Sequence, residues 1–208
     1  LGPERNFSYS FLYGMKFSFR PAKILEIGFS ETVIMGGSGA PSIRWWDPIG
    51  ELFPIHKIAG ANVGARDVSD HKFGILDFRL TLPFLKNTVV YGETYFEDSI
   101  VRALRLPDNF FSQTGLQFGV LLPSFGPQGK WSARLEYQHT PVFGYRHGRW
   151  QTGYTLNSRT LGSHLGPDSE GLNLTLNWWR NLKNKNTLRL AYSMHRSDTY
   201  TTQRSPTG

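Results

Sequence analysis

Cysteine is absent from the 208-residue chain, so the chain forms no disulfide and offers no thiolate ligand to a metal. A hydrophobic run suited to a transmembrane helix is also missing. The longest uncharged run, residues 109–129, is long enough to span a bilayer, but Pro123, Pro127, Gln113, Gln117 and several glycines interrupt it. With a mean hydropathy of −0.36, the chain does not have the composition of a helical membrane protein.

Runs of positive charge are absent as well. The net charge is +7, from 23 lysine and arginine residues against 16 aspartate and glutamate residues, but the basic residues are scattered along the chain. This distribution does not favour nucleic-acid binding. No long helix is predicted, so no glycine-rich loop before a helix is available to hold a phosphate group. We therefore expect no nucleic-acid partner, no cofactor and no bound metal.

The chain does contain several stretches in which apolar and polar residues alternate. In residues 73–98, Phe78 and Leu80 alternate with Asp77 and Arg79, and this period of two predicts a strand with one apolar face. A second alternating limb follows after a short break, so the stretch is a predicted hairpin with one apolar and one charged face. A soluble β-sandwich also buries alternate residues, so this hairpin alone does not distinguish a protein core from lipid.

The lengths of the strands and of their connections favour a membrane barrel. Eight alternating segments are predicted, at residues 7–20, 23–34, 73–82, 88–98, 113–122, 131–139, 171–180 and 187–194. The first has fourteen residues and would reach about 45 Å, longer than most strands of soluble domains. The connections alternate between short and long, which is typical of outer-membrane barrels with tight periplasmic turns and long extracellular loops. The alternative is a soluble antiparallel barrel or sandwich.

The predicted fold is therefore all-β: an antiparallel transmembrane β-barrel with about eight strands in this chain. The aromatic residues near predicted strand ends would form an interfacial girdle, namely Phe19, Trp131, Trp178 and Trp179. The chain begins at Leu1 without a signal peptide and ends in a polar tail, where bacterial barrels usually finish on an aromatic residue. We interpret residues 1–208 as one outer-membrane domain, monomeric and in contact with outer-membrane lipid, that is a section of a larger barrel lacking its final strands.

Several short segments resemble the capsule-assembly Wzi family. They are spread over most of the chain, at residues 25–30, 36–39, 76–80, 91–93, 97–98, 135–137, 153–155 and 161–166. The resemblance implies an outer-membrane lectin, in which a large barrel holds capsular polysaccharide at the surface of a Gram-negative bacterium. It also implies an amino-terminal helical plug, and this sequence lacks a segment that matches the plug.

Two groups of residues are candidates for binding polysaccharide. The first lies in the predicted loops, where aromatic rings would stack on sugar faces and arginines would attract acidic polymers: Trp45, Trp46, Arg66, Tyr145, Arg146, Arg149, Trp150 and Tyr154. The two neighbouring tryptophans are equally well explained as loop-core residues or interface anchors. The second group faces the predicted lumen: Asp77, Arg79, Tyr91, Glu93, Tyr95, Glu97, Arg134, Glu136 and Gln138. These side chains would either pair across neighbouring strands as a structural network or bond the hydroxyls of a glycan.

Catalysis has little support in the sequence. Glu93 and Glu97 are four residues apart on one strand and so about 13 Å apart, too far for either class of glycosidase. A pair across strands, such as Asp77 with Glu93, would lie closer. The histidines show no pattern that matches a serine nucleophile and an orienting acid. The sequence thus predicts a non-catalytic protein that binds surface polysaccharide and helps to attach it to the cell, with a porin or sugar channel and an outer-membrane hydrolase as the alternatives.

Overall fold

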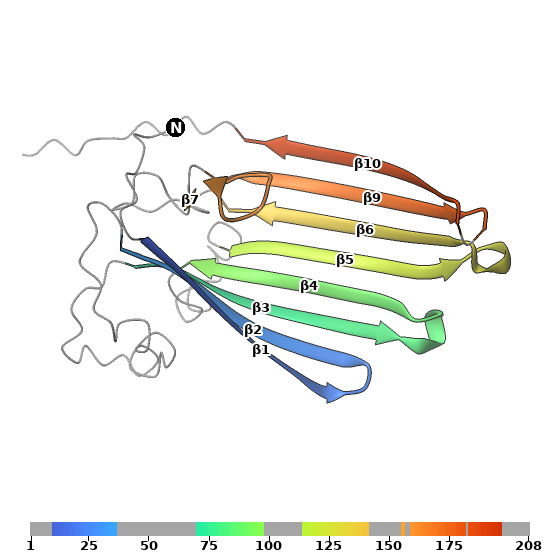
Figure 1. Ribbon diagram of the computed structural model, residues 1–208, viewed down its shortest axis with the longest axis horizontal. Helices are drawn as coiled ribbons and strands as arrows, with labels where there is room; N and C mark the ends of the chain where they lie inside the picture. The colour runs from blue at the N-terminus through green and yellow to red at the C-terminus, as the bar shows by residue number, and fades with distance from the viewer. Residues whose placement is uncertain are drawn as a thin grey trace, which may run out of the picture.

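The computed structural model describes residues 10–36, 70–97, 114–141, 155–156, 159–181 and 183–196. Eight of its strands form one antiparallel sheet in the order β1-β2-β3-β4-β5-β6-β9-β10 (Figure 1). Their bounds are β1 Ser10–Ala22, β2 Leu25–Gly36, β3 Asp70–Leu82, β4 Thr88–Glu97, β5 Thr114–Phe125, β6 Trp131–Thr140, β9 Ser169–Trp179 and β10 Lys185–His195. A separate two-residue ladder joins β7 (Thr155–Leu156) to β8 (Arg159–Thr160). No helix in the described part is long and apolar enough to cross a bilayer.

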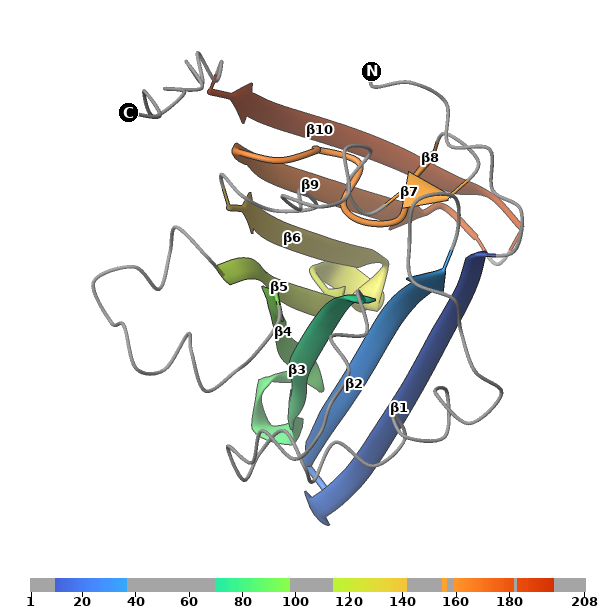
Figure 2. The ribbon, with the colours of Figure 1, turned by 90° about the vertical axis from the view of Figure 1, so that its left-hand side faces the viewer.

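The eight strands of the sheet match the eight predicted segments, and their connections alternate in length as expected. The four short connections, two of which contain a 3-10 turn (η1, Pro83–Leu85, and η3, Pro127–Gly129), lie at the same end of the sheet. This is the right-hand end in Figure 1. Seen from the opposite end, the sheet curves into an open trough, and the β7-β8 ladder lies on its concave side (Figure 2). The described sheet is not closed, because β1 and β10 form its two edges.

The pairing register assigns the residues to the two faces as the alternation predicts. Asp77 pairs with Glu93, Glu93 with Gln117, and Gln117 with Gln138, so one row of polar residues crosses four strands on the concave face. The convex face carries large apolar side chains that remain exposed, among them Phe17 (64%), Leu188 (55%) and Tyr192 (64%). A soluble sandwich would cover such a face, whereas hydrocarbon is its natural solvent. The predicted fold, an antiparallel sheet of the outer-membrane barrel type, is confirmed.

An aromatic row marks the convex face next to the short turns. The Trp131 ring stacks on Trp178 at 5.8 Å between centroids, and Phe125 lies 6.4 Å from Trp131. Phe19 is also exposed near this end, as a girdle residue should be. The prediction for Trp179 is wrong, because alternation turns it to the concave face, where it pairs with Lys185 and the lysine Nζ lies 5.9 Å from its ring centre.

Two predicted strand ends are also wrong, both at prolines. Strand β1 continues through Pro21 and Ala22, and the turn follows at residues 23–24. Proline is tolerated there because β1 is an edge strand of the described sheet and its register shifts at this point. Strand β5 likewise continues past Pro123 to Phe125, with a register shift that leaves the proline outside the regular ladder.

Candidate functional site

The concave face is held together by side chains that reach across a whole strand. Asp77 on β3 extends over β2 and accepts a charged hydrogen bond from Lys16 on β1, with 2.7 Å between Nζ and Oδ2. The β2 residue beneath it is Gly28, and a Cβ atom at that position would overlap the Asp77 carboxylate. The glycine therefore leaves the space through which the two charges meet.

A second bridge of the same kind crosses β5. The Tyr91 hydroxyl on β4 donates to Glu136 Oε1 on β6 at 2.6 Å, and it passes over Gly119. Glu136 also forms an ion pair with Arg134, with 3.2 Å between Oε2 and Nε. Asp77 and Glu136 thus have polar partners, but these are Lys16 and Tyr91, two strands away, and not arginines on the neighbouring strand as predicted. Glycine on the strand in between removes the side chain that would otherwise block the path.

The other predicted lumen residues differ in their surroundings. Tyr95 lies over Gly115 and meets Phe73 edge to face at 5.7 Å. Arg79 and Glu93 form no recorded ion pair with the described residues. Glu97 ends β4, but its side chain lies outside the described part. Glu93 therefore presents a carboxylate to the concave side, while Asp77 is neutralised by Lys16.

Residues 161–168 fold onto the concave face, a position that the alternation of the sequence did not predict. We call these residues the inward segment. Leu161 packs against the buried pair Ile34 and Phe73 on β2 and β3. Leu165, only 5% exposed, lies against Gly171 of β9. The inward segment therefore spans the trough from β9 to β3 and covers part of the sheet near the end with the long connections.

Hydrogen bonds to the ends of β6 and β9 hold the inward segment in place. The Thr140 hydroxyl donates to the Gly166 carbonyl at 2.5 Å and accepts from the Ser169 N–H at 3.0 Å. The Ser169 hydroxyl lies within 2.9 Å of the Pro167 carbonyl and 2.6 Å of His195 Nδ1. Thr140 and Ser169 are almost fully buried. These bonds replace the strand ladder where the chain leaves the sheet.

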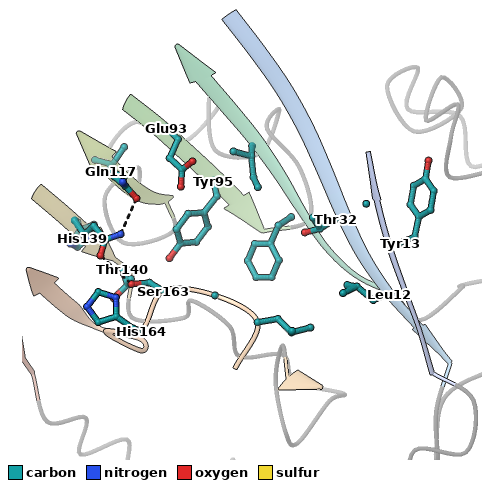
Figure 3. Close-up of a pocket in the computed structure, with 17 residues that line it drawn as sticks. Leu12, Tyr13, Thr32, Glu93, Tyr95, Gln117, His139, Thr140, Ser163 and His164 are labelled. Atoms are coloured by element: carbon teal, nitrogen blue, oxygen red, sulfur yellow. Dashed lines mark hydrogen bonds between the residues drawn. The ribbon is translucent and has the colours of Figure 1, made fainter. Parts of the chain in front are cut away.

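Between the inward segment and the sheet lies a cavity of about 830 Å³. Polar side chains from β4, β5 and β6 line one wall, and Gln138 Nε2 donates to Gln117 Oε1 across it at 2.9 Å. Leu12, Phe73 and Ile75 line the apolar wall. Figure 3 shows Glu93, Tyr95 and Gln117 on adjacent strands around the cavity, whereas the Tyr13 side chain points away from it. The described lining residues are Leu12, Tyr13, Gly14, Thr32, Phe73, Ile75, Glu93, Tyr95, Leu116, Gln117, Gln138, His139, Thr140, Leu161, Gly162, Ser163 and His164.

The chemistry of this cavity is that of a binding site for a molecule rich in hydroxyls. A carboxylate and two side-chain amides offer both acceptors and donors, and Phe73 and Tyr95 supply aromatic surface. No lysine or arginine is among the described lining residues, and Glu93 is the one acidic residue there. The site therefore favours an uncharged ligand over an anionic one.

Comparison with known proteins identifies the family. A family model described as capsule assembly protein Wzi matches residues 3–207. The chain belongs to this family. A solved structure of Wzi from Escherichia coli, an outer membrane protein involved in group 1 capsule assembly and a carbohydrate-binding β-barrel, is 20% identical to it with a TM-score of 0.64. That match covers 92% of this chain and 40% of the E. coli chain. No curated protein matches the sequence.

The sequence-based resemblance to the Wzi family is thus confirmed. The E. coli protein is an outer membrane protein, which agrees with the location that the sequence predicts for this chain. The chain spans less than half the length of the E. coli structure. The division into domains, including the expected plug and further strands, stays a prediction.

Only one of the two groups of candidate residues lies within the described part of this Wzi-family structure. All eight loop candidates, Trp45, Trp46, Arg66, Tyr145, Arg146, Arg149, Trp150 and Tyr154, lie outside the described residues, so their role stays a prediction. Of the lumen group, Glu93, Tyr95 and Gln138 line the cavity. Two further lining residues, Gln117 and Ser163, are not among the residues predicted from the sequence. Gln117 has the right alternation for a lumen position, but Ser163 lies in a stretch without periodicity.

One pair in the structure has the elements of a catalytic dyad. Ser169 Oγ lies 2.6 Å from His195 Nδ1, although the sequence showed no such spacing. The serine is only 2% exposed and its hydroxyl also meets the Leu165 and Pro167 carbonyls. No carboxylate is recorded against His195 in the described residues. The pair fastens the inward segment and lacks the access that a nucleophile needs.

Proposed function

We propose that this chain is part of a non-catalytic outer-membrane protein that binds capsular or other surface polysaccharide and helps to attach it to the cell. The observation that carries the proposal is the hydrogen-bonding cavity under the inward segment, in a chain of the capsule-assembly Wzi family. The E. coli relative of the same fold is a carbohydrate-binding barrel. The cavity lies toward the end with the long connections, which faces the cell exterior in such barrels.

In this mechanism the cavity holds one sugar unit while other contacts hold its neighbours along the polymer. Glu93 accepts hydrogen bonds from sugar hydroxyls, and the amides of Gln117 and Gln138 donate and accept. The predicted loop aromatics, such as Trp45 and Trp46, would stack on further units. Each contact is weak, but a repeating ligand that engages several sites at once is retained by avidity.

The proposal is tested by the distribution of polysaccharide in the source bacterium with and without the gene. We expect deletion to release polymer into the medium while the total amount stays constant, because attachment rather than synthesis is lost. The measurement is the ratio of cell-bound to released polysaccharide. An unchanged ratio would refute attachment as the function.

The cavity itself is tested with Glu93→Gln in the intact protein, titrated by calorimetry with uncharged oligosaccharides and with uronic-acid oligosaccharides from the capsule. Loss of one charged acceptor should weaken binding of the uncharged set about tenfold. Binding of the acidic set should strengthen, because the repelling charge is gone. Glu26→Gln is the matched control, since Glu26 lies on the concave face but outside the cavity. Equal affinities in both variants and the wild type would exclude Glu93 from the site.

The alternative function of a porin or sugar channel shares the polar concave face. The inward segment is the observation against an open channel, because it covers part of that face and is fastened to β6 and β9. Single-channel conductance of the intact protein distinguishes the two functions. A large, steady conductance would favour the channel.

A further inference from the structure

The short turns carry positive charge alone. Basic residues look scattered in the sequence, but the fold gathers seven of them at one end of the sheet, within residues 20–25, 83–87, 126–130 and 180–185. They are Arg20, Lys23, Lys86, Lys130, Arg180, Lys183 and Lys185, and we call them the basic rim. None of the 16 acidic residues falls in these four stretches. The rest of the sheet, in contrast, mixes both signs, as in the pairs Lys16 with Asp77 and Arg134 with Glu136.

Most of the rim charge is not neutralised within the described structure. Arg20 forms an ion pair with Glu26 of the next strand at 2.9 Å, and Lys185 lies over the Trp179 ring. No ion pair is recorded for the other five with any described residue. All the rim residues except Lys130 are exposed, and Lys130 is partly so. The rim is therefore a positively charged surface that attracts anions from outside the chain.

Apolar side chains accompany these charges. Phe84 is 79% exposed and Leu85 51% exposed beside Lys86, and Ile24 is 43% exposed beside Lys23. The row Phe125, Trp131 and Trp178 lies on the convex face just inside the turns. An apolar group next to a lysine, below an aromatic row, suits the boundary between hydrocarbon and phosphate in a bilayer. An acidic soluble partner would explain the lysines but not the exposed phenylalanine.

We propose that the basic rim binds the phosphate groups of anionic phospholipids in the leaflet that meets the short turns. Phe84, Leu85 and Ile24 dip into that leaflet, while the head groups of rim residues without an ion pair, such as Lys23 and Lys86, reach the lipid phosphates. Anionic lipid therefore gathers around this end of the barrel and fixes its depth in the membrane. This role is separate from polysaccharide binding, which the cavity at the other end of the strands performs.

The test uses the quenching of tryptophan fluorescence by brominated lipids, because Trp131 and Trp178 lie on the convex face next to the rim. The intact protein is placed in phosphatidylcholine bilayers that contain brominated phosphatidylglycerol or brominated phosphatidylcholine. We expect phosphatidylglycerol to bind about fivefold more tightly to the wild type, with the preference reduced at high salt. Lys23→Gln with Lys86→Gln should remove most of that preference.

The control is the double variant Arg79→Gln with Arg189→Gln. It also removes two positive charges, but from the concave face and not from the rim. Its lipid preference should equal that of the wild type, and heat modifiability on gels verifies that each variant is folded. No preference in the wild type, or an equal preference in the rim variant, would overturn the proposal.

A soluble acidic polymer, polyglutamate, tests the alternative that the rim binds an acidic partner in solution. If the rim substitutions abolish polyglutamate binding but leave lipid selection unchanged, the rim serves a soluble acidic partner and the lipid proposal fails.

Discussion

Gly115→Ala is expected to destabilise the folded barrel by about 1–3 kcal/mol, although it adds a single methyl group. Gly115 lies directly opposite Tyr95, and a Cβ atom there would overlap the tyrosine ring. The ring is not free to swing away, because its neighbour Phe73 meets it edge to face and Phe73 is buried. The measurement is the urea unfolding midpoint of the intact protein in lipid vesicles.

Gly74→Ala provides the control for this prediction. Gly74 also lies within a strand of the sheet, but apart from Gly74 and its two chain neighbours no residue has an atom within 4 Å of the place where its Cβ would be. Neither glycine has a positive φ, so neither substitution strains the backbone. We expect Gly74→Ala to be neutral or to stabilise by up to about 1 kcal/mol, because alanine restricts the unfolded chain. Equal effects of the two substitutions would show that contact with Tyr95 is not what requires a glycine.

Thr140→Val is expected to release the inward segment and to lower stability by about 2–4 kcal/mol. Valine keeps the shape of threonine but removes the hydroxyl that serves the Gly166 carbonyl and the Ser169 N–H. Both partners would be left without that bond at a site where Thr140 is 1% exposed. The urea midpoint measures the loss, and limited proteolysis within residues 161–168 reports the release of the segment.

Thr175→Val is the matched control, in the interior of β9. The Thr175 hydroxyl forms no hydrogen bond with the described residues. Thr175→Val therefore breaks no such bond, and substitutions away from such features usually change the free energy of unfolding by less than about 0.5 kcal/mol. If Thr140→Val leaves the midpoint and the protease sensitivity unchanged, the hydroxyl is not what holds the inward segment. The cavity would then depend on the packing of Leu161 and Leu165.

Local alternation was a sound guide to much of this protein. The side chains of Asp77, Glu93 and Gln138 were assigned to the concave face from the period of two alone, and the register agrees. The period is reliable because a strand turns successive side chains to opposite faces whatever its neighbours are. The predicted strand ends were wrong at Pro21 and Pro123, where an edge and a bulge change the pairing. Trp179 was assigned to the girdle from its place near a strand end, whereas the alternation itself puts it on the concave face.

By itself the sequence determined the strands, their two faces, the alternation of short and long connections and the resemblance to the family. All of these depend on residues close together in the chain. The tertiary structure alone decided which distant groups meet. Tyr91 reaches Glu136 over Gly119, and Leu161 packs against Phe73, because the register and the curvature of the sheet bring these residues together. The basic rim has the same origin: its lysines are far apart in sequence, and antiparallel pairing places all four short turns at one end.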